Sequence, residues 1–185
     1  MSRLLASVLA ILVAAAVGVP AVGAQSAPTP HDILATYLSA VPDVTSGATT
    51  TYDDSQMPVA SIVQLNPNTY DSKGLAGLQL VMIKGTSADA ANAGFTAMVG
   101  NLKDQGVALE PNPVAAFGSR PNVVGSKPMT LTNGASATQI IFLLQSTDTV
   151  LEVIATGGSD ADPQQVAQFV GTTAGGMLKL VDPSF

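Results

Sequence analysis

The segment that decides the predicted fold is ATQIIFLLQSTDTVLEVIAT, residues 137–156. Its two strongly apolar runs, Ala137–Gln145 and Val150–Thr156, are joined by the polar quartet Ser146–Thr149, which is the pattern of a β-hairpin. Glu152 stands in the middle of the second run. Because successive strand residues point to opposite faces, we interpret it as a residue on the solvent face of its strand.

Two amphipathic helices are predicted on either side of this hairpin in the chain. The first, Ser87–Gln105, has capping residues at its start, apolar residues spaced by three and four, and Gly106 as its stop. The second, Pro163–Leu180, follows the N-cap residue Asp162 and carries an apolar stripe that includes Phe169. Each stripe needs a sheet to cover.

Shorter elements complete the prediction. A short N-terminal helix begins near Pro30 and ends before Pro42. Strands are predicted at Val59–Leu65 and Leu75–Lys84, and a strand interrupted by prolines, and therefore at a sheet edge, at Val107–Phe117. A short strand is possible at Pro128–Thr132, and loops are predicted at Val44–Pro58 and Gly118–Lys127. The predicted fold class is α+β, a mostly antiparallel sheet covered by the two amphipathic helices.

An apolar leader precedes this domain. Arg3 gives it a positive start, Leu4–Val17 is uninterrupted and apolar, and small residues lead to a cleavage site before Gln25, so residues 1–24 have the pattern of a secretory signal. An uncleaved anchor is the alternative, but the run is shorter than the roughly 20 residues of a spanning helix. We expect an exported protein, periplasmic or secreted, with no stable membrane anchor after cleavage. Residues 25–30 are expected to be a flexible N-terminus and residues 31–185 a single α+β domain.

Composition excludes several functions. The chain has no cysteine, so it has no disulfide, no thiol nucleophile and no thiolate ligand. Without the leader, six basic residues face thirteen acidic ones, a net charge of −7. Because nucleic-acid binding depends on Lys and Arg that neutralise phosphates, nucleic acid is not an expected partner.

Residues that could carry catalysis are scarce. The chain has one histidine, His31, and two glutamates, Glu110 and Glu152. Nucleophilic hydrolysis needs a base beside a Ser or Cys, and zinc needs several His or Cys ligands, so His31 is interpreted as a surface residue. Helix capping explains Asp160 and Asp162 without calcium. No catalytic, metal or cofactor-binding residue is assigned, and no cofactor is expected.

The loop predicted at Val44–Pro58 is a tentative ligand or partner surface. Its candidate residues are Tyr52, Asp53, Asp54 and Met57. Tyr52 and Met57 could border a groove for an apolar ligand or a peptide, since methionine adapts to varied partners. The expected partner is a protein or a small apolar ligand, and its identity stays open.

The chain also suggests a weak internal repeat. A shift of 71 residues aligns residues of the same type in two strand–turn–helix units, namely Leu80 with Leu151, Ile83 with Ile154, Asp89 with Asp160 and Val99 with Val170. Duplication is one explanation. The other is that every strand-to-helix junction selects the same capping and inner-face residues.

The order of elements resembles the PsbP-like α/β/α sandwich of extracytoplasmic accessory proteins. Residues 75–106 and 137–180 carry this likeness, which is architectural and includes no diagnostic motif. The lipid-bearing cysteine of the lipoprotein-type members is missing. The resemblance implies a non-enzymatic accessory or binding role, and it assigns no functional residue.

Two hypotheses about function follow. The first is an exported binding or accessory protein without catalytic activity. The alternative is an extracytoplasmic hydrolase or isomerase that uses Asp, Ser, Tyr or Lys in a pocket without a known motif, because acid–base catalysis needs only one suitably shifted group. Convergence of Asp53, Asp54, Glu152 or Lys84 would favour the enzyme, and scattered exposed carboxylates would favour the binding protein.

Overall fold

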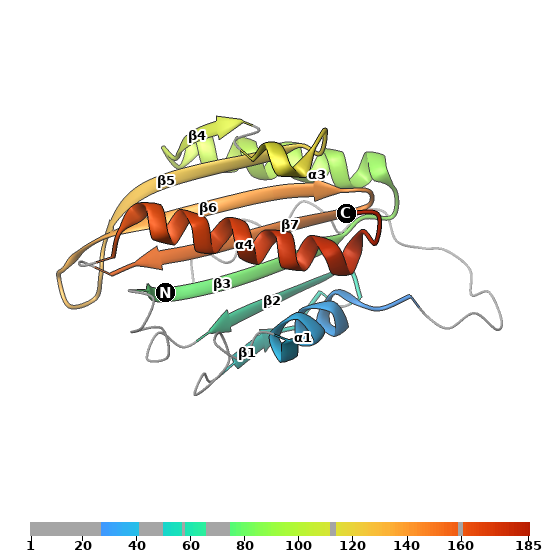
Figure 1. Ribbon diagram of the computed structural model, residues 1–185, viewed down its shortest axis with the longest axis horizontal. Coiled ribbons are helices and arrows are strands. Elements are labelled where there is room, and N and C mark those ends of the chain that lie inside the picture. The colour runs from blue at the N-terminus through green and yellow to red at the C-terminus, as the bar shows by residue number, and fades with distance from the viewer. Residues whose placement is uncertain (1–26, 41–49, 57, 66–74, 112–113, 159–160) are drawn as a thin grey trace.

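The computed structural model describes residues 27–40, 50–56, 58–65, 75–111, 114–158 and 161–185. Its centre is a seven-stranded sheet with the strand order β1-β2-β3-β7-β6-β5-β4 (Figure 1). The strands are β1 (Thr50–Asp53), β2 (Ala60–Leu65), β3 (Leu75–Lys84), β4 (Ala108–Pro111), β5 (Asn122–Thr130), β6 (Ser136–Ser146) and β7 (Thr149–Gly157). The helices are α1 (Pro30–Ala40), α3 (Ala88–Asp104), the 3-10 helix η4 (Ala115–Phe117) and α4 (Pro163–Val181).

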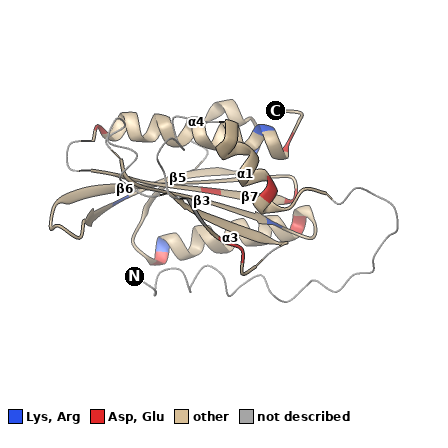
Figure 2. Ribbon diagram, turned by 90° about the horizontal axis from the view of Figure 1, so that it is seen from below, with Lys and Arg blue, Asp and Glu red and all other residues tan. Residues whose placement is uncertain are grey.

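Helices cover both faces of this sheet. Helices α1 and α4 lie on one face and α3 lies on the other (Figure 2). The buried apolar side chains form two clusters, the larger under α1 and α4 with Phe142 and Met177, the smaller under α3 with Phe95 and Leu143. All neighbouring strands are antiparallel. The predicted α+β class, an antiparallel sheet covered by amphipathic helices, is confirmed.

The hairpin predicted at residues 137–156 is confirmed and lies near the middle of the sheet. Strand β7 pairs with β6 along its whole length, from Thr149 opposite Ser146 to Gly157 opposite Thr138. Phe142 is 1% exposed and Leu151 is fully buried, both on the face covered by α4. The two strands are apolar on both faces because helices cover both, whereas a strand with one wet face would alternate.

Helix α3 links β3, in the middle of the sheet, to β4 at its edge. The Ser87 hydroxyl caps the helix by accepting a hydrogen bond from the Ala90 N–H at 3.1 Å. Gly106, with a φ of 75°, follows its end. Both features agree with the prediction, and so does the edge position of β4.

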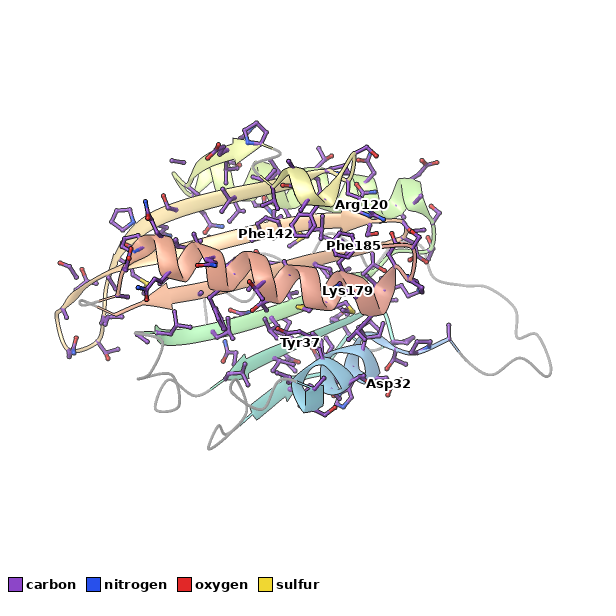
Figure 3. All side chains as sticks on the ribbon, viewed as in Figure 1. Asp32, Tyr37, Arg120, Phe142, Lys179 and Phe185 are labelled. Carbon is purple, nitrogen blue, oxygen red and sulfur yellow. The ribbon has the colours of Figure 1, made fainter. Side chains whose placement is uncertain are left out.

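Helix α4 begins as predicted, since Asp162 accepts a hydrogen bond from the Gln164 N–H at 2.9 Å and Pro163 takes the first helical position. Its residue Phe169, predicted to face the sheet, lies only at the margin of the larger cluster. Helix α1 packs beside α4, and its Tyr37 is buried in that same cluster (Figure 3).

Two segments predicted as loops, Val44–Pro58 and Gly118–Lys127, contain β1 and the first part of β5, and the end of β5 falls in the possible strand predicted at Pro128–Thr132. In β5, Gly125 and Pro128 suggest an interruption, but the strand continues because it pairs with β6 from end to end. A side chain at position 125 would clash, since a Cβ there would stand 2.5 Å from Cγ1 of Val107. Glycine therefore allows the chain entering β4 to pack against β5.

The two units of the suspected repeat pack differently. Leu80 and Leu151, which a shift of 71 residues aligns, both belong to the cluster under α1 and α4. Helix α4 covers that face, whereas α3 covers the opposite face (Figure 2). The units are therefore not superposable copies. Their common pattern reflects the need of each helix for a sheet to cover.

The predicted signal peptide, residues 1–24, lies outside the described residues. Of the expected flexible N-terminus, residues 27–29 are described without regular structure, and α1 begins at Pro30. None of the helices in the described part of the chain is long and apolar enough to cross a membrane.

Candidate functional site

A pocket opens where the first turn of α4 meets the ends of β5, β6 and β7. Its volume is about 340 Å³, which falls within the range of small-molecule sites. The lining includes Pro128, Ser136, Thr138, Ile140, Ala161 and Val166. The lining combines apolar and polar surface, and the cavity is large enough for a small ligand.

The local sequence explains why the start of α4 can approach β7 so closely. Gly157 ends β7 and lines the pocket. A Cβ at this position would stand 3.0 Å from the Cβ of Ala161 and 3.4 Å from Cγ2 of Val166. A larger residue at position 157 would push the helix away from the strand. The glycine thus positions one wall of the pocket.

Among the described residues that line this pocket, none has a charged side chain; Asp160, between the lining residues Gly158 and Ala161, lies outside the described residues. Its polar side chains are the hydroxyls of Ser136 and Thr138, which lie two residues apart and so on the same face of β6. Among the described residues, neither hydroxyl has a hydrogen-bond partner in the protein. Both are free to orient a bound molecule. The pocket can bind a ligand, but its described lining contains no group that would act as an acid, a base or a strong nucleophile.

Three of the four residues of the predicted ligand or partner surface are described, and two of them meet His31. The ring of Tyr52 stacks on the His31 ring with centroids 4.3 Å apart. Asp54 Oδ2 lies 2.6 Å from His31 Nδ1. Asp53 is exposed and accepts a hydrogen bond from the Ser55 N–H instead. Met57 lies outside the described residues.

The His31 cluster, which we define as His31, Tyr52, Asp54 and Ser61, does not form a catalytic triad. In a triad the histidine contacts the serine, but here the Ser61 hydroxyl donates to Asp54 Oδ1 at 2.7 Å. Asp54 therefore binds both His31 and Ser61, and no histidine contacts the Ser61 hydroxyl to act as its base. Burial raises the pKa of the Tyr52 hydroxyl, and the charge of Asp54 raises it further. The cluster ties α1 to β1 and β2.

Glu152 corrects a prediction, because it does not lie on a solvent face. It does point away from Leu151, as predicted, but α3 covers that side of the sheet and leaves Glu152 only 5% exposed. Its cross-strand neighbours are Val81 and Leu143. Burial alone raises the pKa of its carboxyl to about 7. Sequence reasoning missed this because only the tertiary structure shows that both faces of β7 are covered.

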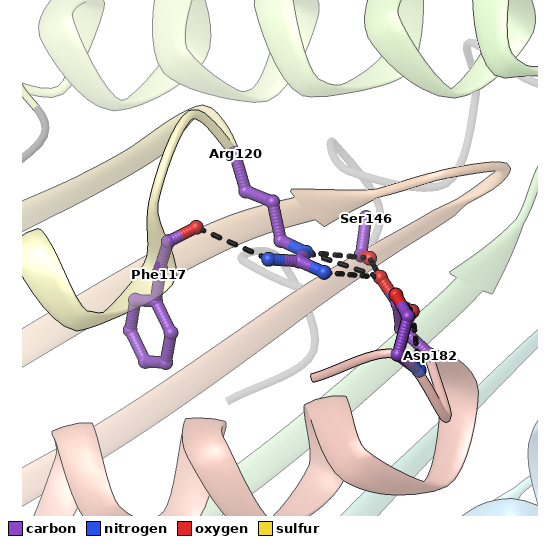
Figure 4. A network of polar contacts seen from close by, with 5 residues as sticks. Phe117, Arg120, Ser146 and Asp182 are labelled. Atoms are coloured by element: carbon purple, nitrogen blue, oxygen red, sulfur yellow. Dashed lines mark hydrogen bonds and ion pairs between the residues drawn. The ribbon is translucent and has the colours of Figure 1, made fainter.

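Other charged groups are committed to structural contacts. Arg120 bonds to Asp182 Oδ2 through Nη2 at 2.7 Å, and Ser146 donates to the same oxygen at 2.9 Å (Figure 4). Hydrogen bonds from Ser184, Arg120 and Ser146 hold the pKa of the Asp182 carboxyl well below its usual range. The network fixes the end of the chain to the sheet. Lys84 pairs separately with Asp148 at 3.2 Å.

The titratable groups that would favour an enzyme do not converge. Asp54 lies in the His31 cluster, Asp53 is exposed, Glu152 is buried under α3 and Lys84 pairs with Asp148. Within the described ranges, no three His, Asp or Glu side chains are close enough to hold a metal ion. Asp162 caps α4, and Asp160 lies outside the described residues.

Comparison with known proteins finds a distant structural likeness and no related family. No family model and no curated protein matches the chain. A crystal structure at 1.50 Å resolution from Bacteroides thetaiotaomicron VPI-5482 is similar over 65% of this chain, with a TM-score of 0.38 and 10% sequence identity. This chain covers 38% of that one. A likeness of this extent carries no information about function.

Proposed function

We propose that the protein is an exported binding or accessory protein without catalytic activity, and that it binds a small, mostly apolar ligand at the start of α4. The observation that carries this proposal is the pocket of about 340 Å³, whose described lining has no charged side chain and combines apolar side chains with the two free hydroxyls on β6. Such a lining favours an apolar body with one or two polar atoms. The accessory role implied by the PsbP-like resemblance is part of the proposal.

The alternative, a hydrolase or isomerase, would depend on the His31 cluster. His31 Nδ1 faces Asp54, as in catalytic pairs, which is the observation in its favour. Against it, the Ser61 hydroxyl is bonded to Asp54 rather than to His31, and no residue of this cluster lines the pocket at the start of α4. We therefore place binding before catalysis.

Filling the pocket should abolish ligand binding. The neutral fluorescent probe N-phenyl-1-naphthylamine should bind the protein saturably at one site, and Ala161→Leu should weaken its affinity at least about ten-fold because the added side chain occupies the cavity. The matched control is Ala93→Leu, at an exposed position of α3 on the other face of the sheet. Probe titration measures both. Equal affinities for the two variants, or no saturable binding by the wild type, would contradict the proposal.

Export can be tested on the intact chain. The mature protein recovered from the periplasm or the medium should begin at Gln25, because the leader pattern ends there. Intact-mass spectrometry of the exported protein gives its first residue. Recovery of a species that retains Met1 would refute cleavage, and recovery only from the cytoplasm would refute export.

A further inference from the structure

The layer between α3 and the sheet contains two buried polar side chains, Glu152 and Gln145. Glu152 is 5% exposed, and no hydrogen bond or ion pair joins it to another residue of the described chain. Gln145 is 9% exposed, and its Oε1 has no hydrogen-bond partner among the described groups. Buried polar atoms are normally satisfied, so a buried carboxyl without a protein partner and an unsatisfied amide oxygen in the same layer require an explanation.

The strand register places these two side chains next to each other. Glu152 lies opposite Leu143, and Gln145 lies opposite Val150, so the two are diagonal neighbours on β7 and β6. Leu143 and Val150 belong to the cluster under α3, which shows that Gln145 and Glu152 point to this face. The pair is therefore a polar spot within the apolar contact between α3 and the sheet.

No other charge on the described elements that pack around Glu152 faces its carboxyl. Strand β6 contains no charged residue, and Lys84 of β3 points to the other face of the sheet, since its neighbour Ile83 lies under α3. Residues of α3 that face the sheet are apolar, and its charged residues are exposed, namely Asp89, Lys103 and Asp104. An ionised Glu152 would thus be a buried charge without a counter-charge, which is a costly state.

We propose that α3 is a pH-dependent cover, which loosens from the sheet when the buried Glu152 carboxyl loses its proton. Lifting α3 would hydrate the carboxylate and Gln145 Oε1 together. It would leave the larger cluster under α1 and α4 intact, so this opening costs less than global unfolding. The raised pKa of Glu152 supports the proposal by placing the transition near neutral pH. Below that pH the carboxyl is neutral and can stay buried in the apolar layer under α3. Above it, the opened state exposes the apolar face under α3.

The absence of cysteine makes a direct test possible. A single thiol introduced by Ala91→Cys reports on the inner side of α3, and one introduced by Ala174→Cys reports on the inner side of α4, both at positions no more than 2% exposed. Labelling rates are measured between about pH 5.5 and about pH 8 and are divided by those of an unstructured peptide thiol, because only the thiolate reacts.

The corrected labelling rate at position 91 should rise at least about ten-fold over this range, whereas that at position 174 should stay constant. Adding Glu152→Gln, a neutral side chain of the same shape, should remove the rise at position 91. A parallel rise at both positions, a rise that survives Glu152→Gln, or no rise would overturn the proposal. Amide hydrogen exchange of α3 and α4 in the chain without introduced thiols, corrected for intrinsic rates, should show the same contrast and excludes an effect of the cysteines.

Discussion

Phe142→Ala should lower the free energy of unfolding by about 3 to 5 kcal/mol. The ring is 1% exposed on β6 and lies between the sheet and α4, with the Phe117 ring centroid 5.5 Å away (Figure 3). Truncation to alanine removes its apolar contacts and leaves a cavity that the paired strands cannot collapse to fill. Urea denaturation monitored by circular dichroism measures the loss as a shift of the midpoint.

Phe169→Ala is the matched control for this deletion. It removes the same atoms from α4, but Phe169 is only partly buried at the margin of the same cluster. Its loss should be roughly half as large or smaller, since part of the ring already contacts water. Phe142→Leu, which keeps most of the volume, should remain folded if the alanine variant does not. Equal destabilisation by the two alanine substitutions would show that the larger core is not centred on β6.

Stability should fall as the pH rises from about 4.5 to about 7, because of Glu152. Burial raises the pKa of its carboxyl from 4.5 to about 7 in the folded chain. Between these values the unfolded chain has lost the proton that the folded chain keeps, so the folded state loses up to about 1.4 kcal/mol per pH unit. The full contribution is on the order of 3 kcal/mol, present below the lower value and lost above the higher one.

Glu152→Gln should remove this slope and make the protein more stable than the wild type at about pH 8. The control is Glu110→Gln, at an exposed position of β4, which should leave the slope unchanged. The denaturant midpoints of both variants and the wild type, measured across the pH range, show which substitution removes the slope. If the Glu152→Gln protein kept the wild-type pH dependence, the Glu152 carboxyl would not be the source of that dependence.

The parts of the fold that could be predicted are those with local signals. The hairpin is marked by two apolar runs around a polar turn, and the start of α4 is marked by Asp162 followed by Pro163. These residues act on their immediate neighbours, so their effect can be read from their order in the chain. The first part of β5, residues 122–127, could not be predicted this way, because its backbone partner β6 overrides the signal of Gly125.

The candidate site was predictable only in part, for a related reason. Tyr52 and Asp54 were selected from the sequence, but their contact with His31 joins residues more than twenty positions apart and has no local signature. The pocket at the start of α4 likewise combines residues of β5, β6, β7 and the first turn of α4. None of them is unusual where it stands in the chain.

The amino-acid sequence by itself determined the class of the fold, the positions of the two long helices, the hairpin and the lack of thiol and disulfide chemistry. These follow from residue type and periodicity, which act over a few neighbouring positions. Only the tertiary structure decided that α3 and α4 cover opposite faces of the sheet, and hence that Glu152 is buried rather than wet. Strand periodicity shows which residues share a face of the sheet. Whether that face is buried depends on a helix that is distant in the chain and packs against it.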